Sequence, residues 1–219
     1  MSLTKEHNKV VENPDETVIK YKFPYWGPFV MDVEMEDKII SLLLEKGKES
    51  REKKLDHRKS LAGMIDNEYY YEDPDEWFCP LFNPYVYAYI EAVSNYKKDA
   101  FKWTPRGWGL EKLWINYQKA YEYNPPHSHG GDLSFVIYLQ IPEEILKENK
   151  ETKHIHNNAG PGTISFDIGP DLPFYIAAHD MLPTVGQTFI FPAWLSHHVL
   201  AFKSDVERIS VSGNIVFKK

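Results

Sequence analysis

The second half of the chain is a succession of short β-rich runs, and this pattern restricts its possible folds more than any other feature. Runs such as DLSFVIYLQI, GTISFDIG and ERISVSGNIVF are rich in β-branched and aromatic residues, which favour strands. Glycine, proline and asparagine separate the runs at intervals of roughly ten residues, as is typical of antiparallel sandwiches and barrels. We therefore expect an antiparallel β-sandwich or barrel from about residue 109 onward.

The first half has helical character. Asp37 is a suitable helix cap, and it precedes a face of isoleucine and leucine. From Pro84 to about Phe101, aromatic and aliphatic residues recur at three- and four-residue spacing, which predicts a second helix. Between these segments, the acidic and tyrosine-rich stretch 66–77 is interpreted as a loop, either lying over a pocket or serving as a connector. Helices precede the strands rather than alternating with them, which favours an α+β fold.

Length and composition predict one globular domain over 1–219, because a chain of 219 residues with 42% hydrophobic side chains can bury a sizeable core. Within it we expect residues 1–16 to be flexible, 17–108 to form helical support and a lid, and 109–219 to form the β core with the functional site. The oligomeric state is not readable from the sequence.

Composition also limits the location and partners. No apolar run approaches the length of a membrane span, and the N-terminal residues lack the apolar region of a secretory signal. Cys79 is the single cysteine, so a reducing, cytoplasmic compartment is expected. The net charge of −7 makes nucleic acid an unlikely partner, since it opposes binding to a phosphate backbone.

Histidines at two places in the β-rich half predict a metal site. His127 and His129 precede a strand, and residues two apart on an extended chain point to the same side. His197 and His198 lie about seventy residues downstream; their opposite parity allows only one of them to point inward. Two ligands from one strand and one from a distant strand leave open coordination positions, and imidazole suits iron, zinc, copper or nickel.

The last strand carries an unusual polar face. Arg208, Ser210, Ser212 and Asn214 share one parity, whereas the aliphatic residues between them mostly take the other. This face is either solvated, with the arginine paired to a nearby acidic residue, or lines a polar cavity. An inward arginine beside a hydroxyl is a suitable anchor for a carboxylate, because its guanidinium donates two charge-assisted hydrogen bonds in a fixed geometry.

Together, four motifs resemble those of the superfamily of 2-oxoglutarate and Fe(II)-dependent oxygenases. They are H-x-H at 127–129, the LSFVIYL run at 133–139, FPAWLSH ending at His197, and RISVSGN from Arg208. They are most similar to those of prolyl-hydroxylase-like oxygenases from marine bacteria and cyanophages. The resemblance spans Leu113–Phe217 and implies a double-stranded β-helix, a jelly-roll and cupin-like core that holds iron at its mouth.

Carried over by position, the resemblance implies a role for five residues. His127 matches the first iron ligand and His197 the distal one. Arg208 matches the basic residue that binds the far carboxylate of 2-oxoglutarate, and Ser210 matches the hydroxyl two residues on. Tyr117 falls where prolyl-hydroxylase-like members place a tyrosine on the same carboxylate, although its aromatic-rich strand leaves a place in the core equally open.

One position departs from the family pattern. Most members have aspartate or glutamate where this chain has His129, so three neutral imidazoles would bind the iron. Asp132 is the alternative third ligand: its parity is wrong for a regular strand, but the preceding Gly130–Gly131 pair could bend the backbone and deliver its carboxylate. We expect His129 to be the ligand.

The resemblance implies an Fe(II)- and 2-oxoglutarate-dependent dioxygenase that hydroxylates an unidentified substrate and releases succinate and CO2. The substrate, whether a small molecule or a protein side chain, is not readable from the sequence. Two alternatives remain open: a cupin-like three-histidine metalloenzyme that does not use 2-oxoglutarate, and a non-catalytic jelly-roll binding module.

Overall fold

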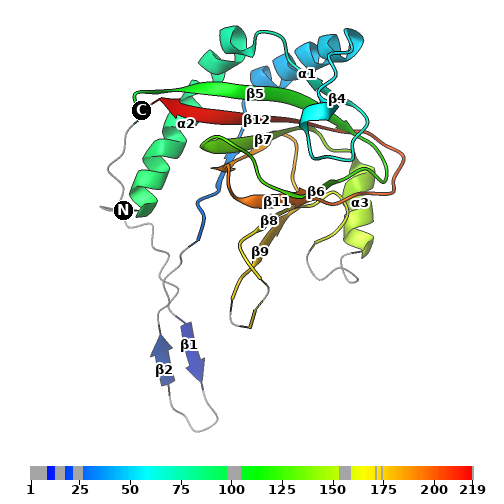
Figure 1. Cartoon of the computed structure of the whole chain (residues 1–219). Helices are drawn as coiled ribbons and strands as arrows, with labels where there is room; N and C mark the ends of the chain where they lie inside the picture. Colours follow the sequence, from blue (N-terminus) through cyan, green and yellow to red (C-terminus); the bar gives the residue numbers. More distant parts are fainter. Residues whose placement is uncertain are drawn as a thin grey trace.

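A computed structural model describes residues 9–12, 18–21, 27–97, 105–152, 159–170, 172–173 and 175–218, and most of its elements are labelled in Figure 1. The helices are α1 (Asp37–Glu52), α2 (Pro74–Lys97) and α3 (Glu143–Thr152), with a single 3-10 turn at Arg58–Ser60. The strands are β1 (Lys9–Glu12), β2 (Val18–Tyr21), β3 (Met31–Glu34), β4 (Glu68–Tyr70), β5 (Gly107–Gln118), β6 (Asn124–His127), β7 (Leu133–Gln140), β8 (Ile164–Asp167), β9 (Ala178–Met181), β10 (Gln187–Pro192), β11 (Ser196–Val199) and β12 (Arg208–Lys218).

Two antiparallel sheets form the body of the protein. The larger has the order β3-β10-β7-β12-β5-β4 and the smaller the order β6-β11-β8-β9. Apolar side chains from both sheets pack between them, as is usual for a sandwich; Tyr138 and Phe189 of the larger sheet meet Phe166 of the smaller. The α+β prediction, with an antiparallel β-sandwich in the second half, is confirmed.

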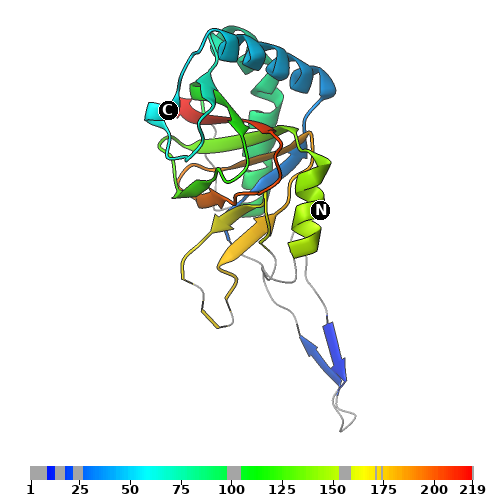
Figure 2. The ribbon, with the colours of Figure 1, turned by 90° about the vertical axis from the view of Figure 1, so that its right-hand side faces the viewer.

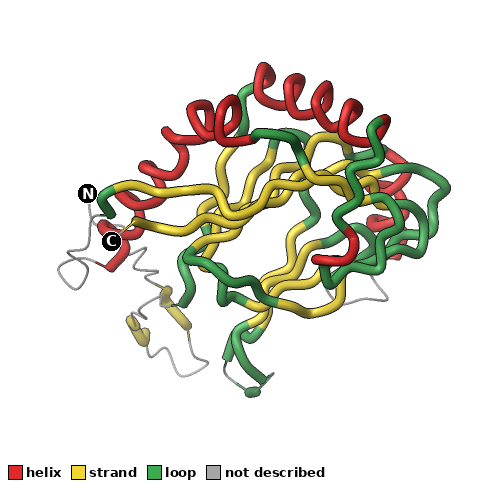
Figure 3. The backbone as a smooth tube through the Cα atoms, turned by 45° about the horizontal axis from the view of Figure 1, so that its top comes forward, coloured by secondary structure: helices red, strands yellow, loops and turns green. Residues whose placement is uncertain are grey.

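Helices α1 and α2 cover the outer face of the larger sheet, as Figures 2 and 3 show from two directions. Leu43 of α1 and Phe82 of α2 are fully buried there against Ile115, Val211 and other aliphatic residues of the sheet. The ring centroids of Phe82 and Phe135 lie 4.4 Å apart. Because the helices bury one face of β5, β7 and β12, the opposite face of these strands is turned toward the smaller sheet.

The start of helix α2 differs from the sequence-based prediction. Helix α2 begins at Pro74 rather than near Pro84, and it contains Pro80 and Pro84. Proline has no backbone N–H, so it is tolerated in the first turn of a helix, where the N–H groups have no intrahelical acceptor, but further inside it removes a hydrogen bond. The packing of Phe78 and Phe82 in the core offsets this loss. The predicted end near residue 101 lies outside the described residues.

The prediction of a loop over 66–77 is wrong for two parts of this stretch, and the residues from Pro74 onward belong to α2. Residues Glu68–Tyr70 form β4, which pairs with the edge of β5 in the register Glu68↔Asn116. The acidic and aromatic composition gave no strand period, but the free edge of β5 offers backbone partners to any extended segment beside it. Strands β3 and β4, both from before residue 109, thus complete the two edges of the larger sheet. None of the described helices is long and apolar enough to cross a membrane.

Candidate active site

Three histidines from two neighbouring strands of the smaller sheet converge. His127 is the last residue of β6 and lies directly opposite His197 of β11, and His129 follows two residues after His127. The ring centroids of His127 and His197 are 4.4 Å apart, and that of His129 is 4.9 and 5.1 Å from them. One ring nitrogen from each residue lies within 4.8 Å of the others, so all three can reach one metal ion.

The hydrogen bonds of two of these rings set their tautomers. Nδ1 of His127 lies 2.7 Å from the carbonyl oxygen of Pro125, and Nδ1 of His197 lies 3.0 Å from that of Leu195. A carbonyl oxygen only accepts, so each Nδ1 carries the proton and each Nε2 keeps its lone pair for a metal. Burial lowers the pKa of His129 to about 4 and that of His197 to about 3, which keeps both rings neutral. These donors therefore fit a divalent transition metal.

The structure places the other candidate ligands away from this cluster. The Asp132 carboxylate accepts a hydrogen bond of 2.7 Å from the backbone N–H of Phe217 at the far end of β12. His198 has opposite parity to His197, and its Nδ1 lies 2.9 Å from the carboxylate of Asp167. Within the described residues, the metal-binding group comprises the three histidines and no carboxylate.

The three histidines line a cavity of about 160 Å³ between the two sheets. Strands of both sheets form its walls, and residues 60–63 and Ile65, which precede β4, close one side. Typical sites for drug-sized ligands are several hundred Å³. This cavity is therefore suited to a small molecule or to one inserted side chain.

Arg208 lines this cavity and has no anionic partner among the described residues. Its side chain is buried, and its Nη1 donates a 2.7 Å hydrogen bond to the carbonyl oxygen of Gly162. Its Nε is buried with no partner, and no described carboxylate lies within ion-pair distance. Burial lowers the pKa of this guanidinium. An unpaired buried cation costs free energy, so the site is arranged to receive an anion.

Polar residues on four adjacent strands form a row across the cavity face of the larger sheet. Tyr138 of β7 lies opposite Ser210 of β12, Ser210 lies opposite Asn116 of β5, and Asn116 lies opposite Glu68 of β4. All four residues are buried and line the cavity. The Tyr138 hydroxyl has no partner, and its ring centroid is 5.6 Å from the Arg208 guanidinium carbon.

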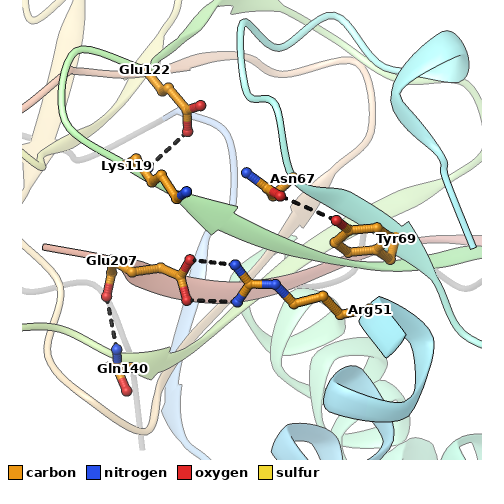
Figure 4. Close-up of polar contacts among 7 residues, drawn as sticks. All are labelled: Arg51, Asn67, Tyr69, Lys119, Glu122, Gln140 and Glu207. Carbon is orange, nitrogen blue, oxygen red and sulfur yellow. Dashed lines mark hydrogen bonds and ion pairs between the residues drawn. The ribbon is translucent and has the colours of Figure 1, made fainter. Parts of the chain in front are cut away.

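Tyr117 is not part of this arrangement, contrary to the expectation that it would approach Arg208. It lies opposite Ile209 in the β5–β12 register, so its side chain takes the helix-covered face of the sheet. There the Arg51 guanidinium carbon lies 4.3 Å from its ring centroid. Arg51 also makes two hydrogen bonds of 2.9 and 3.0 Å to Glu207 (Figure 4), so Glu207 pairs with a helix residue and not with Arg208.

Two residues of the site, Tyr138 and Glu68, were missed in the sequence. Tyr138 lies inside the LSFVIYL motif. Because a buried tyrosine needs a hydrogen-bond partner for its hydroxyl, its place in an otherwise apolar strand could have marked it as a candidate site residue. Nothing in the acidic stretch around Glu68 distinguished it from its exposed neighbours. Burial, and then the charges of Glu122 and Asp56, raise the pKa of Glu68 to about 8, while Arg58 opposes the shift.

The raised pKa of Glu68 predicts a pH-dependent cost in stability. Its carboxyl is neutral in both states below its ordinary pKa. As pH rises toward 8, the unfolded chain ionises before the folded one does, so stability falls by something on the order of a few kcal/mol. Glu68→Gln should therefore raise the thermal midpoint at pH 8 and leave it nearly unchanged at pH 4.5. Thermal unfolding at both pH values measures this, with the exposed Glu91→Gln as control; equal shifts at both pH values would contradict it.

The fold is similar to that of solved prolyl hydroxylases. A Pseudomonas putida prolyl-4-hydroxylase has a TM-score of 0.53 at 14% identity, over 88% of this chain and 93% of that one. A prolyl hydroxylase from Trichoplax adhaerens, in complex with a peptide of hypoxia inducible factor, has a TM-score of 0.51 at 8% identity, over 86% and 82%. A viral collagen prolyl hydroxylase from Paramecium bursaria Chlorella virus-1 has 0.50 at 15%, over 86% and 96%. The predicted double-stranded β-helix is confirmed.

The sequence also matches a family. No protein in the curated set is a match, but the family model described as "Putative 2OG-Fe(II) oxygenase" matches residues 112–214. This segment holds the three converging histidines and the buried Arg208. Over this segment, the chain is similar to the 2OG-Fe(II) oxygenases, the enzymes that use iron(II) with 2-oxoglutarate as cosubstrate.

Proposed function

We propose that His127, His129 and His197 hold Fe(II) in a dioxygenase that hydroxylates a substrate not yet identified. The proposal is supported by the convergence of three imidazole nitrogens within 4.8 Å and by the two tautomers that leave Nε2 free. When bound, iron and 2-oxoglutarate would supply the chemistry for C–H hydroxylation with O2 as the oxidant: one oxygen atom goes to the substrate and the other to succinate, and CO2 is released. The histidines leave coordination positions open toward the cavity for the cosubstrate.

The far carboxylate of 2-oxoglutarate is assigned to Arg208, Ser210 and Tyr138. The observation that carries the assignment is the buried guanidinium of Arg208, which has no anion among the described residues and lies in the same cavity as the histidines. Its free Nε–H and the unpartnered hydroxyl of Tyr138 are both donors that a carboxylate would satisfy. Tyr138 takes the role that the sequence had suggested for Tyr117.

The rest of the chain excludes water and supports the site. We assign the whole of 1–219 to one oxygenase domain, with 17–108 as support and lid for a core over 109–219. Residues 60–63 line the cavity from outside the core, and β3 and β4 join its larger sheet. Closure over a small cavity strengthens electrostatic interactions inside it and keeps water from the reacting groups.

The proposal also includes the location and the substrate class. The enzyme would be cytoplasmic and would act on a small molecule or a protein side chain rather than on nucleic acid. These assignments are supported by the single cysteine and by the net charge of −7.

The test is spectroscopic and chemical. Under anaerobic conditions, Fe(II) and 2-oxoglutarate together should give a weak visible charge-transfer band, which the family resemblance implies and which neither component gives alone. With oxygen, the same protein should release succinate. Absence of the band with iron bound would contradict cosubstrate chelation and would favour a three-histidine enzyme that does not use 2-oxoglutarate.

Tyr138→Phe should weaken 2-oxoglutarate binding, because it removes one hydroxyl donor and leaves the ring in the core. The loss of a neutral donor to a charged acceptor is worth about 1.5–3 kcal/mol, or roughly 10- to 150-fold in the dissociation constant. Titration of the charge-transfer band measures it. Tyr117→Phe is the matched control, since its hydroxyl lies on the helix side of the sheet, and it should leave the affinity unchanged. The opposite pattern would restore Tyr117 to the site.

A further inference from the structure

One wall of the cavity, lined by β4, β5 and β6, carries unpartnered hydrogen-bond acceptors. Arg208 of β12 adjoins this wall, since it lies opposite Gln118 of β5. Four buried oxygen atoms there have no hydrogen-bond partner. They belong to residues that all line the cavity: Glu68, Asn116, Gln118 and Asn124. Buried acceptors without partners are rare in folded proteins and each one costs free energy. Their concentration on one wall indicates that a ligand with hydrogen-bond donors supplies the missing hydrogen bonds.

The orientation of two of these amides is fixed by their neighbours. Asn116 Nδ2 donates to the carbonyl oxygen of Ser210 at 3.4 Å, and Gln118 Nε2 donates to that of Glu122 at 2.6 Å. A carbonyl oxygen accepts only, so in each amide the nitrogen must take that side. The oxygens are therefore the atoms left without a partner. Both amides therefore present acceptor oxygens to the cavity.

Glu68 adds a carboxyl group to this wall. The residue is 2% exposed, and its Oε2 is one of the four atoms without a partner. The nearest cation that acts on it, Arg58, is already paired with Asp56 through two side-chain hydrogen bonds of 2.9 and 2.8 Å. The other two charges acting on it, Glu122 and Asp56, are also acidic. No cation of the described residues neutralises Glu68, and its surroundings favour a cation from outside the chain.

This wall lies in the same cavity as the histidines. Trp114 lies two residues before Asn116 on the same strand face, and its ring centroid is 6.0 Å from that of His129. Glu68 and Asn116 are directly opposite each other on neighbouring strands. A molecule bound by its donor group at Glu68 would thus lie in the same cavity as the metal-binding histidines.

We propose that Glu68, together with Asn116 and Asn124, binds a protonated amine of the primary substrate. A primary ammonium donates three hydrogen bonds, and its positive charge would neutralise the ionised carboxyl group of Glu68. The inference rests on the proposed function, because it takes the neighbouring histidines as the reaction centre. It makes the enzyme specific for C–H bonds a short distance from an amine, whether that amine is a free metabolite or a lysyl side chain of a peptide.

Binding can be measured on the metal-free full chain, independently of turnover. The probes are n-butylamine and its neutral counterpart n-butanol, titrated calorimetrically. Only the amine should bind, and it should bind more tightly at pH 8.5 than at pH 6.5. At pH 7 its binding should release about one proton, because Glu68 must ionise to pair with the ammonium while the other charges acting on it, Arg58, Asp56 and Glu122, change little. Equal binding of amine and alcohol would overturn the proposal.

Variants identify the group responsible. Glu68→Gln, which keeps the shape of the side chain, should weaken amine binding roughly 10- to 100-fold and abolish the proton release. Glu72→Gln makes the same substitution on a nearby exposed residue outside the cavity, and it should bind the amine as the natural chain does. If Glu68→Gln, shown to be folded by circular dichroism, binds the amine as tightly as the natural chain, the proposal is wrong.

Turnover separates this proposal from the one on which it rests and distinguishes the two sources of amine. With Fe(II) and 2-oxoglutarate, succinate release should be stimulated by free n-butylamine or by a short blocked lysine peptide, and not by n-butanol or the matching blocked norleucine peptide. Whichever amine is active identifies the source. Amine binding without any 2-oxoglutarate consumption would sink the oxygenase assignment alone, whereas 2-oxoglutarate consumption that no amine stimulates would sink the amine assignment alone.

Discussion

The substitution His197→Ala should abolish iron retention and substrate turnover while leaving the fold intact. His197 is buried opposite His127, and its Nδ1–H is committed to the Leu195 carbonyl, so its Nε2 has no other function in the described structure. Loss of a group that merely orients a metal ligand costs about 10- to 100-fold in metal affinity, so loss of the ligand itself should cost more. Iron content after desalting, together with circular dichroism, measures both halves of the prediction.

The neighbouring residues give the control for this experiment. His198→Ala removes an imidazole from the adjacent position on the outer face, and Asp132→Ala removes the carboxylate that the sequence left as an alternative ligand. Both variants should retain iron, because neither residue belongs to the converging group. His129→Ala should lose it. Iron retained by His129→Ala but lost by Asp132→Ala would show that the third ligand is the carboxylate.

The substitution Arg208→Lys should weaken 2-oxoglutarate binding and leave the metal affinity near normal. The Arg208 guanidinium can present two parallel N–H groups to a carboxylate, and an ammonium cannot reproduce that geometry. The loss of one charge-assisted hydrogen bond costs about 1.5–3 kcal/mol, or roughly 10- to 150-fold in the dissociation constant. Arg208→Gln, which also removes the charge, should cost more.

The neutral variant Arg208→Gln has a second expected effect that is independent of catalysis. Arg208 is a buried cation without an anion in the described structure, so a neutral residue of similar size should raise the thermal midpoint of the cosubstrate-free protein. A lower affinity combined with a higher stability would identify Arg208 as a binding residue. Unchanged 2-oxoglutarate affinity in Arg208→Gln would remove it from the site.

The sequence by itself determined the features that depend on local geometry. Side chains two apart on an extended strand share a face, so H-x-H and R-x-S each placed two functional groups on one side. The same parity separated His197 from His198. The residue types then specified the chemistry, since imidazoles suit a transition metal and an arginine suits a carboxylate.

Tertiary structure decided which strands are neighbours and which face of each meets the cavity. In β5 every residue from Leu113 to Gln118 is buried, because helices cover one face and the cavity side is enclosed as well. Hydrophobic alternation therefore could not tell Tyr117 from Asn116, and a shift of one residue in register would exchange their faces. The register chose Tyr138 as the partner of Ser210 and placed Glu68 beside Asn116. Such pairings join residues far apart in the chain, and no local period encodes them.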